Sequence, residues 1–226
     1  MLATSSEAVN VGRVVDPGWR TTITSADPIE IPATVEDLAV FMLDPCPPTI
    51  DTPEYKSIER TIAASTLAGI EYMDREMLPR EMVQRMDVYP REHSGRGALG
   101  RFVGAESPWI RIPRVPVIEL TAVRIFDTSG DMEELTPDDY EVDEVSEPAR
   151  LKLMAPPGRF SLAEFAGIRI EYQAGYPDDT LPAPIKEGVI AHAAYMIEQR
   201  GHDVRGAIEK SGAAAYWSPY RMWTGL

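Results

Sequence analysis

The sequence predicts an α+β fold in which a few helices, two N-terminal and one or two C-terminal, flank an inserted small antiparallel β-sheet or barrel, with extended terminal arms. Three observations indicate this fold. Helical periodicity occurs on both sides of the middle, short strand-like runs separated by turn residues fill the middle, and 20 prolines cluster between these segments. Of the 226 residues, 44% are hydrophobic, which is enough material for a sizeable core.

We divide the chain at the points where its pattern changes. The parts are an extended N-terminal arm (1–31), a helical part (32–78), a β-rich domain (79–176), a second helical part (177–210) and a C-terminal tail (211–226). The arm shows no helical or strand period, and Pro17, Gly18 and Pro28 favour an extended conformation.

The first helical part contains two predicted helices with clear start signals. The first spans Thr34–Leu43, with Thr34 as the N-cap that accepts hydrogen bonds from free N–H groups of the first turn. The second runs from its N-cap, Thr52, to about Arg75, with Pro53 at the first helical position. The residues on one face of this helix, which we call its stripe, follow one another at spacings of three or four. They are Tyr55, Ile58, Ile62, Thr66, Gly69 and Met73.

The middle of the chain reads as several short strands. The predicted strands are Glu81–Tyr89, Trp109–Ile112, Ile118–Phe126, Tyr140–Val145, Arg150–Met154 and Gly167–Tyr172. Gly95–Gly104 is predicted as a flexible glycine-rich loop. Turn residues between the runs indicate a small antiparallel sheet or barrel.

A third helix is predicted after the β-rich middle, with Pro184 at its start and Gly201 at its end. Its stripe comprises Ile185, Val189, His192, Ala193 and Met196. Only the weakly helical run Val204–Lys210 separates this helix from an aromatic tail.

The composition excludes several classes of function. There are 22 Lys+Arg and 36 Asp+Glu, so the net charge is 22 − 36 = −14, which argues against a protein that wraps nucleic acid or binds anionic membranes. No apolar run reaches the length of a membrane span, and residues 1–10 do not resemble a secretory signal, so we expect an intracellular soluble protein. The single cysteine, Cys46, excludes an intramolecular disulfide and a multi-cysteine zinc site.

The short motifs do not point to an enzyme. Gly95–Gly100 matches G-x-G-x-x-G, but no βαβ pattern surrounds it, so a surface loop is the better interpretation. The acidic run Asp138–Glu144 lacks EF-hand spacing and is interpreted as a solvated strand and turn. His192 and His202 have no third ligand at a suitable spacing, and no base or cation lies near Cys46 in the sequence. We therefore expect no catalytic site, no metal and no cofactor.

The tail is rich in residues typical of interfaces. Its candidate docking residues are Tyr216, Trp217, Tyr220, Arg221, Met222 and Trp223. Aromatic side chains and arginine dominate protein–protein hot spots, and terminal segments are loose unless they are anchored. We favour docking onto another chain over the alternative, in which the tail folds back onto its own core.

A set of segments in a fixed order carries a resemblance to a known family. The segments are Val35–Leu38, Gly69–Met73, Ile112–Ile118, Leu135–Val142, Ile168–Tyr176, Leu181–Lys186 and Pro219–Trp223. In this order they resemble the head–tail connector (adaptor) proteins of long-tailed phages and gene transfer agents. Compared with that family, the arm 1–31 is longer and the stretch 91–107 is an insertion.

The resemblance implies a non-enzymatic virion protein that is made in the host cytoplasm. Copies, typically twelve, would form a ring beneath the portal vertex, with the C-terminal tail on the portal protein and a stopper or tail-terminator protein on the other side. DNA would pass through the ring without sequence-specific binding, and no membrane would be involved. The helical parts would build the ring body. The candidate residues for the interface between neighbouring copies come from the stripes of the helices and are Tyr55, Ile58, Ile62, Thr66, Met73, Val189 and Met196.

Three further hypotheses remain open at this stage. The acidic chain, repeated around a channel, would give a negative wall that repels DNA phosphates. A small soluble enzyme or binding protein with a pocket in the β-rich middle is the alternative function. A scaffold protein of an unrelated complex is a further one.

Overall fold

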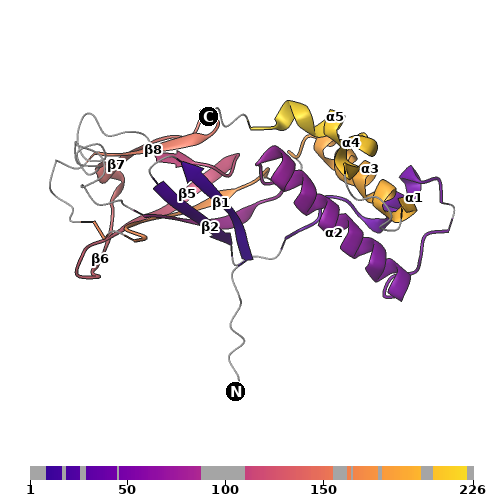
Figure 1. The fold of residues 1–226 in the computed structure, drawn as a ribbon, viewed down its shortest axis with the longest axis horizontal. Coiled ribbons are helices and arrows are strands. Elements are labelled where there is room, and N and C mark those ends of the chain that lie inside the picture. The colour runs from indigo at the N-terminus through magenta and orange to yellow at the C-terminus, as the bar shows by residue number, and fades with distance from the viewer. Residues whose placement is uncertain are drawn as a thin grey trace, which may run out of the picture. The chain divides into compact units, whose positions relative to one another are not determined.

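The computed structural model describes residues 9–16, 19–25, 29–44, 46–87, 110–154, 162–163, 165–177, 180–199 and 206–222. The chain forms two compact units, and each draws on two separate stretches of sequence. A β unit comprises residues 1–28 and 80–174, and a helical unit comprises residues 29–79 and 175–226. The predicted α+β class, with a β-rich insertion between helical segments, is therefore confirmed (Figure 1).

The β unit contains two antiparallel sheets. The larger sheet has six strands in the order β1-β2-β3-β9-β5-β6, and the smaller has three in the order β4-β8-β7. The larger comprises β1 (Val9–Asp16), β2 (Trp19–Ser25), β3 (Arg80–Met86), β5 (Val117–Phe126), β6 (Met132–Glu134) and β9 (Ile168–Ala174). The smaller comprises β4 (Ile110–Ile112), β7 (Tyr140–Asp143) and β8 (Ala149–Leu153), with the one-turn 3₁₀ helix Pro137–Asp139 before β7. The strand orders are open, so the barrel that the sequence left as an alternative does not form.

Strands β1 and β2 correct the prediction of an arm without strand structure over 1–31. They pair as an antiparallel hairpin, and β2 extends the sheet by pairing with β3, for example Thr22 with Arg85. Ile23 of β2 is buried in the core of the β unit. A strand in which three of seven residues are threonine, and which depends on pairing with a distant segment, has little hydrophobic alternation to detect. Residues 1–8 lie outside the described part.

The core of the β unit follows the two-residue period of its strands. In β9, alternate side chains are buried, namely Ile168, Ile170, Tyr172 and Ala174. In β3, Met82, Gln84 and Met86 share one face, and all three side chains are buried. Gln84 satisfies its amide by donating to the carbonyl oxygen of Arg111 at 3.0 Å.

The helical unit contains α1 (Val35–Phe41), α2 (Pro53–Met73), α3 (Ala183–Gln199), α4 (Ala207–Lys210) and α5 (Ala213–Trp217), followed by the 3₁₀ turn Ser218–Tyr220. The predicted caps are present. The Asp37 backbone N–H donates to Thr34 Oγ1 at 3.1 Å, and the Tyr55 N–H donates to Thr52 Oγ1 at 3.2 Å. Helix α3 contacts α1, α2 and α5, so it is the central element of this unit.

Candidate assembly surfaces

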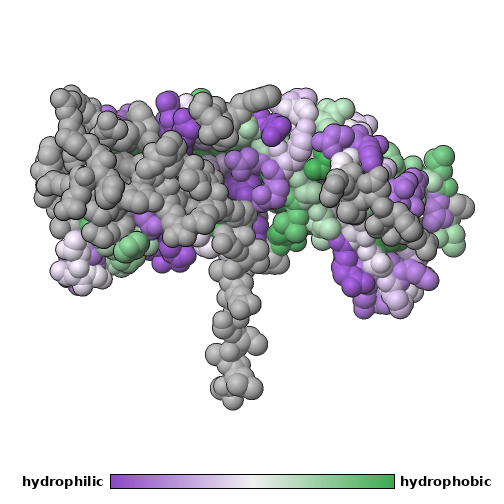
Figure 2. Space-filling model, viewed as in Figure 1, coloured by the Kyte–Doolittle hydropathy of each residue, from purple (hydrophilic) through white to green (hydrophobic). Residues whose placement is uncertain are grey.

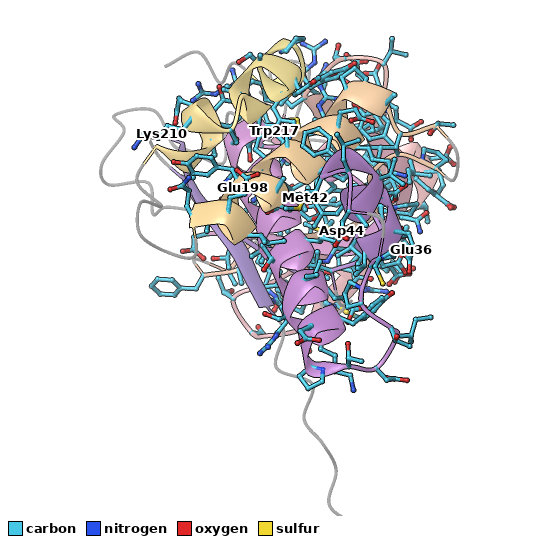
Figure 3. All side chains as sticks on the ribbon, turned by 90° about the vertical axis from the view of Figure 1, so that its right-hand side faces the viewer. Glu36, Met42, Asp44, Glu198, Lys210 and Trp217 are labelled. Atoms are coloured by element: carbon cyan, nitrogen blue, oxygen red, sulfur yellow. The ribbon has the colours of Figure 1, made fainter. Side chains whose placement is uncertain are left out.

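The C-terminal segment of the helical unit is built around Trp217. Helix α5 places the Trp217 side chain in the core, where it is 0% exposed. Its indole Nε1 donates to the carbonyl oxygen of Ile185 at 3.1 Å. Gly69 of α2 and Gly188 of α3 form the slot for the ring, because a Cβ atom at either position would collide with the indole. Figure 3 labels Trp217 on the ribbon of α5.

Two further rings enclose the indole. The ring centroids of Tyr72 and His192 lie 6.0 Å and 5.9 Å from that of Trp217, in tilted arrangements typical of aromatic pairs. His192 Nδ1 lies 2.9 Å from Ser65 Oγ. Burial lowers the pKa of His192 from its usual value of 6.5, so the imidazole is neutral at pH 7.

The residues that follow Trp217 are anchored by Arg75, just beyond the end of α2. Arg75 Nε donates to the carbonyl oxygen of Tyr220 at 3.1 Å, and Nη1 donates to the hydroxyl of Tyr176 at 3.1 Å. The Met222 backbone N–H donates to the carbonyl oxygen of Met73 at 2.9 Å. The chain is therefore held to the end of α2 as far as Met222.

These contacts correct part of the predicted docking tail. A docking role for Trp217 requires an exposed side chain. The chain instead folds back and buries this side chain in its own core. Tyr216 and Arg221 are exposed, and Tyr220 and Met222 are half-buried. Trp223 lies outside the described residues.

The predicted ring interface is also corrected in part. Ile62, Thr66, Met73 and Val189 are each 0% exposed, so these four side chains cannot meet a neighbouring copy. They are buried because the stripes of α2 and α3 face each other and the rest of the helical core. Tyr55, Ile58 and Met196 are half-buried and keep surface that a neighbour can contact.

An exposed apolar surface that the sequence interpretation missed lies at the end of α1. This α1–α2 patch consists of Val40, Phe41, Met42, Leu43 and Ile50. Val40 is 76% exposed and Leu43 is 88% exposed. Figure 2 shows apolar surface at the right-hand edge of the view, where Figure 1 places α1. The signal was available, since four consecutive apolar residues at 40–43 exceed what one helix face can bury.

A groove lies between α2 and α3. Its volume is ≈ 430 Å³, and it is lined by Ser57, Arg60, Thr61, Ala64, Ser65, His192 and Met196. Arg60 is the one charged side chain of this lining, since His192 is neutral at pH 7. We name this surface the α2–α3 groove.

The other candidate residues show no catalytic or metal-binding arrangement. Ser146 and Arg150 hydrogen-bond to Asp143 and hold its pKa below the usual 3.8, so this part of the acidic run has a structural role. Cys46 is an exposed free thiol. Within the described ranges, no group of three or more His, Cys, Asp or Glu side chains is placed to hold a metal ion. The motif Gly95–Gly100 and His202 fall outside those ranges.

Among the described residues, no helix is both long and apolar enough to cross a membrane. No protein-family model matches the sequence, and no curated protein matches it.

Solved structures do match the fold. A chain in a structure described as "Neck of empty GTA particle computed with C6 symmetry" superposes with a TM-score of 0.62 at 17% identity, covering 90% of this chain and 97% of that chain. A second, described as "Virion of native gene transfer agent (GTA) particle", gives a TM-score of 0.57 at 16% identity, covering 90% and 97% of the two chains. A third, "Neck of native GTA particle computed with C12 symmetry", gives 0.54 at 19% identity, covering 75% and 84%. The protein therefore shares its fold with chains of gene transfer agent particles.

Proposed function

We propose that this protein is a structural component of a virion neck, where it forms an adaptor ring between the portal vertex of the capsid and the tail. The observation that carries the proposal is the extent of the fold match, which spans 90% of this chain and 97% of a chain from a gene transfer agent neck. A likeness over nearly the whole of both chains includes both the β unit and the helical unit. The order of sequence segments that resembles the adaptor family supports the same role.

The ring is proposed to contain twelve copies. Two of the matching structures were computed with C6 and C12 symmetry, which supports this number. A closed ring joins copies through a heterologous contact, so each copy needs two different surfaces. The helical unit carries an apolar patch and a separate groove, which meets this requirement.

The partners above and below the ring follow from the same role. The exposed remainder of the C-terminal segment, including Tyr216 and Arg221, is proposed to contact the portal protein. A stopper or tail-terminator protein would bind the opposite face. DNA would pass through the channel without sequence-specific binding, and the net charge of −14 per copy supports a wall that repels phosphates. The role needs no enzymatic activity and no cofactor.

The mass of the native assembly tests the proposal. Light scattering on the isolated protein, together with quantification of the chain in purified particles, should give a ring-sized oligomer or about a dozen copies per particle. A stable monomer that is absent from every particle fraction would contradict the neck role and favour an enzyme or a binding protein.

A further inference from the structure

We propose that the α1–α2 patch of one copy binds the α2–α3 groove of the next copy, and that this contact closes the ring. The inference rests on the proposed ring and identifies the two surfaces that join its copies. Four features of the helical unit carry it: the backbone at Leu43, the charges beside the patch, the lining of the groove, and the positions of the two surfaces around α2.

Leu43 is an unusual residue for its position. The N–H of Leu43 donates to the carbonyl oxygen of Val40 at 3.2 Å, and the N–H of Asp44 donates to that of Ala39 at 2.9 Å. These two bonds form a Schellman cap, whose left-handed position is normally glycine. Leu43 occupies it with φ of 56° and leaves its side chain 88% exposed. The leucine improves neither the backbone nor the packing of the isolated chain, so its side chain is suited to a contact outside the chain.

The charges beside the patch are negative. Glu36 and Asp44 are exposed carboxylates on either side of the apolar residues along the chain. Neither forms an ion pair with another described residue. Figure 3 labels both of them together with Met42 of the patch. A partner that fits this surface is apolar at its centre and basic at its rim.

The α2–α3 groove has this complementary chemistry. Ala64 and Met196 supply apolar lining, and Arg60 supplies the positive charge, with no carboxylate among the lining residues. Arg60 Nε donates to the carbonyl oxygen of Lys56 at 3.2 Å, and no described carboxylate pairs with its guanidinium. The flexible Met196 side chain can adapt to an inserted leucine or phenylalanine.

The two surfaces lie on opposite sides of α2. Helix α1 contacts α2, and Tyr55 of α2 packs against the hydrophobic cluster that contains Val35 and Leu38 of α1, which places α1 beside the Tyr55 side of α2. Because successive helical residues turn by about 100°, Ser57 and Ala64 of the groove point away from the Tyr55 side. A patch on one side and a groove on the other permit a head-to-tail contact but prevent both from meeting within one chain. This is the arrangement that a heterologous ring contact requires.

Substitutions of Leu43 separate assembly from folding. We expect Leu43→Asp to raise the protein concentration needed for assembly by about tenfold or more, because it removes an apolar anchor and adds a charge. Leu43→Gly should weaken assembly while the melting temperature stays the same or rises, because glycine tolerates the positive φ. Light scattering and thermal unfolding on the same samples measure both effects. A Leu43→Gly protein that assembles as the wild type does would overturn the proposal.

Cysteine crosslinking tests the pairing directly. In a Cys46→Ser background, Leu43→Cys combined with Ala64→Cys should give a ladder of covalent multimers on mild oxidation, because the pair meets only between copies. The matched control combines Ala64→Cys with Val145→Cys, whose side chain is 95% exposed in the β unit. This control should give no ladder.

The outcomes distinguish this inference from the proposed function. If the wild type assembles but the Leu43–Ala64 pair gives no more crosslinking than the control, the pairing is wrong and the neck role stands. If Leu43→Asp rings form normally but do not enter particles, the patch binds a different neck protein and the pairing is again wrong. A wild-type chain that neither assembles nor enters particles removes the proposed function and this inference together.

Discussion

Trp217 shows how one side chain can determine the arrangement of a helical unit. Its indole lies between Gly69 and Gly188, donates to the carbonyl oxygen of Ile185, and contacts the rings of Tyr72 and His192. Two glycines inside helices carry a cost in helix propensity, so their presence at the contact is explained by the space that the indole needs. The residue belongs to the core and not to a docking surface.

Truncation of Trp217 should therefore act mainly by lowering the free energy of unfolding and not by removing a docking contact. We expect Trp217→Ala to destabilise the protein by about 3–5 kcal/mol, because the cavity left by a buried aromatic ring does not collapse fully. Urea unfolding monitored by circular dichroism measures this change. Tyr216→Ala, at the neighbouring exposed position, is the matched control and should change stability by less than about 0.5 kcal/mol. Equal effects of the two substitutions would contradict the core role of Trp217.

His192 makes the stability of the helical unit depend on pH. Burial lowers the pKa of His192 below 6.5, so the unfolded chain binds the proton more readily than the folded chain. The stabilisation is complete above the unfolded pKa and is lost as the pH falls through that value toward the lower folded pKa. The lowered pKa values of Asp37 and Asp143 place their own transitions below pH 3.8, outside this range.

The pH dependence should disappear when the imidazole is replaced. Between pH 7.5 and pH 5.5 we expect the wild-type melting temperature to fall, because the unfolded chain takes up a proton that burial of His192 disfavours in the folded chain. His192→Asn keeps a polar group near Ser65 but does not titrate, so it should lose much less stability over the same range. Equal losses in the two proteins would show that another group causes the dependence.

At the scale of elements, local chemistry explains where the helices begin. Thr34 and Thr52 accept hydrogen bonds from first-turn N–H groups, and both caps were readable in the sequence. Most strands of the β-rich middle were readable from their alternation, whereas the three-residue strand β6 was not predicted. The β1–β2 hairpin was not readable, because its second strand gains stability by pairing with β3 across a long stretch of sequence.

The turn Ser218–Tyr220 depends on one side chain from another element. Arg75→Ala removes the donors to the Tyr220 carbonyl oxygen and the Tyr176 hydroxyl, so this terminal turn should open more often. We expect local protection to fall by about 1–3 kcal/mol, measured as faster hydrogen exchange of the Met222 amide, whose bond to Met73 should weaken.

A second arginine provides the control for this prediction. Arg221 is exposed and its guanidinium lies 5.2 Å from the centroid of the Tyr72 ring. Such an exposed cation–π contact contributes about 0.5–1 kcal/mol, so Arg221→Ala should have the smaller effect on exchange. If exchange at Met222 were unchanged in the Arg75→Ala protein, Arg75 would not be the anchor.

At the scale of the whole molecule, the chain leaves the helical unit after Pro79 and returns to it at Gly175. The helical core is therefore completed only when α3 and α5, from the second stretch, pack against α1 and α2 from the first. The insertion of a β-rich segment between helical segments was visible in the order of sequence patterns. The contacts that complete each core were not visible, because they join residues far apart in the chain.

The sequence by itself determined the α+β class, the caps at Thr34 and Thr52, and the two-residue alternation of strands such as β9, because these features depend on neighbouring residues. Only the tertiary structure decided which apolar side chains are covered. Trp217 near the chain end is buried, whereas Leu43 beside a capped helix is exposed. Burial is a property of long-range packing, and composition at a single position does not specify it. The apolar run at 40–43 was visible in the sequence, but its exposure, and the groove between α2 and α3, followed from the fold.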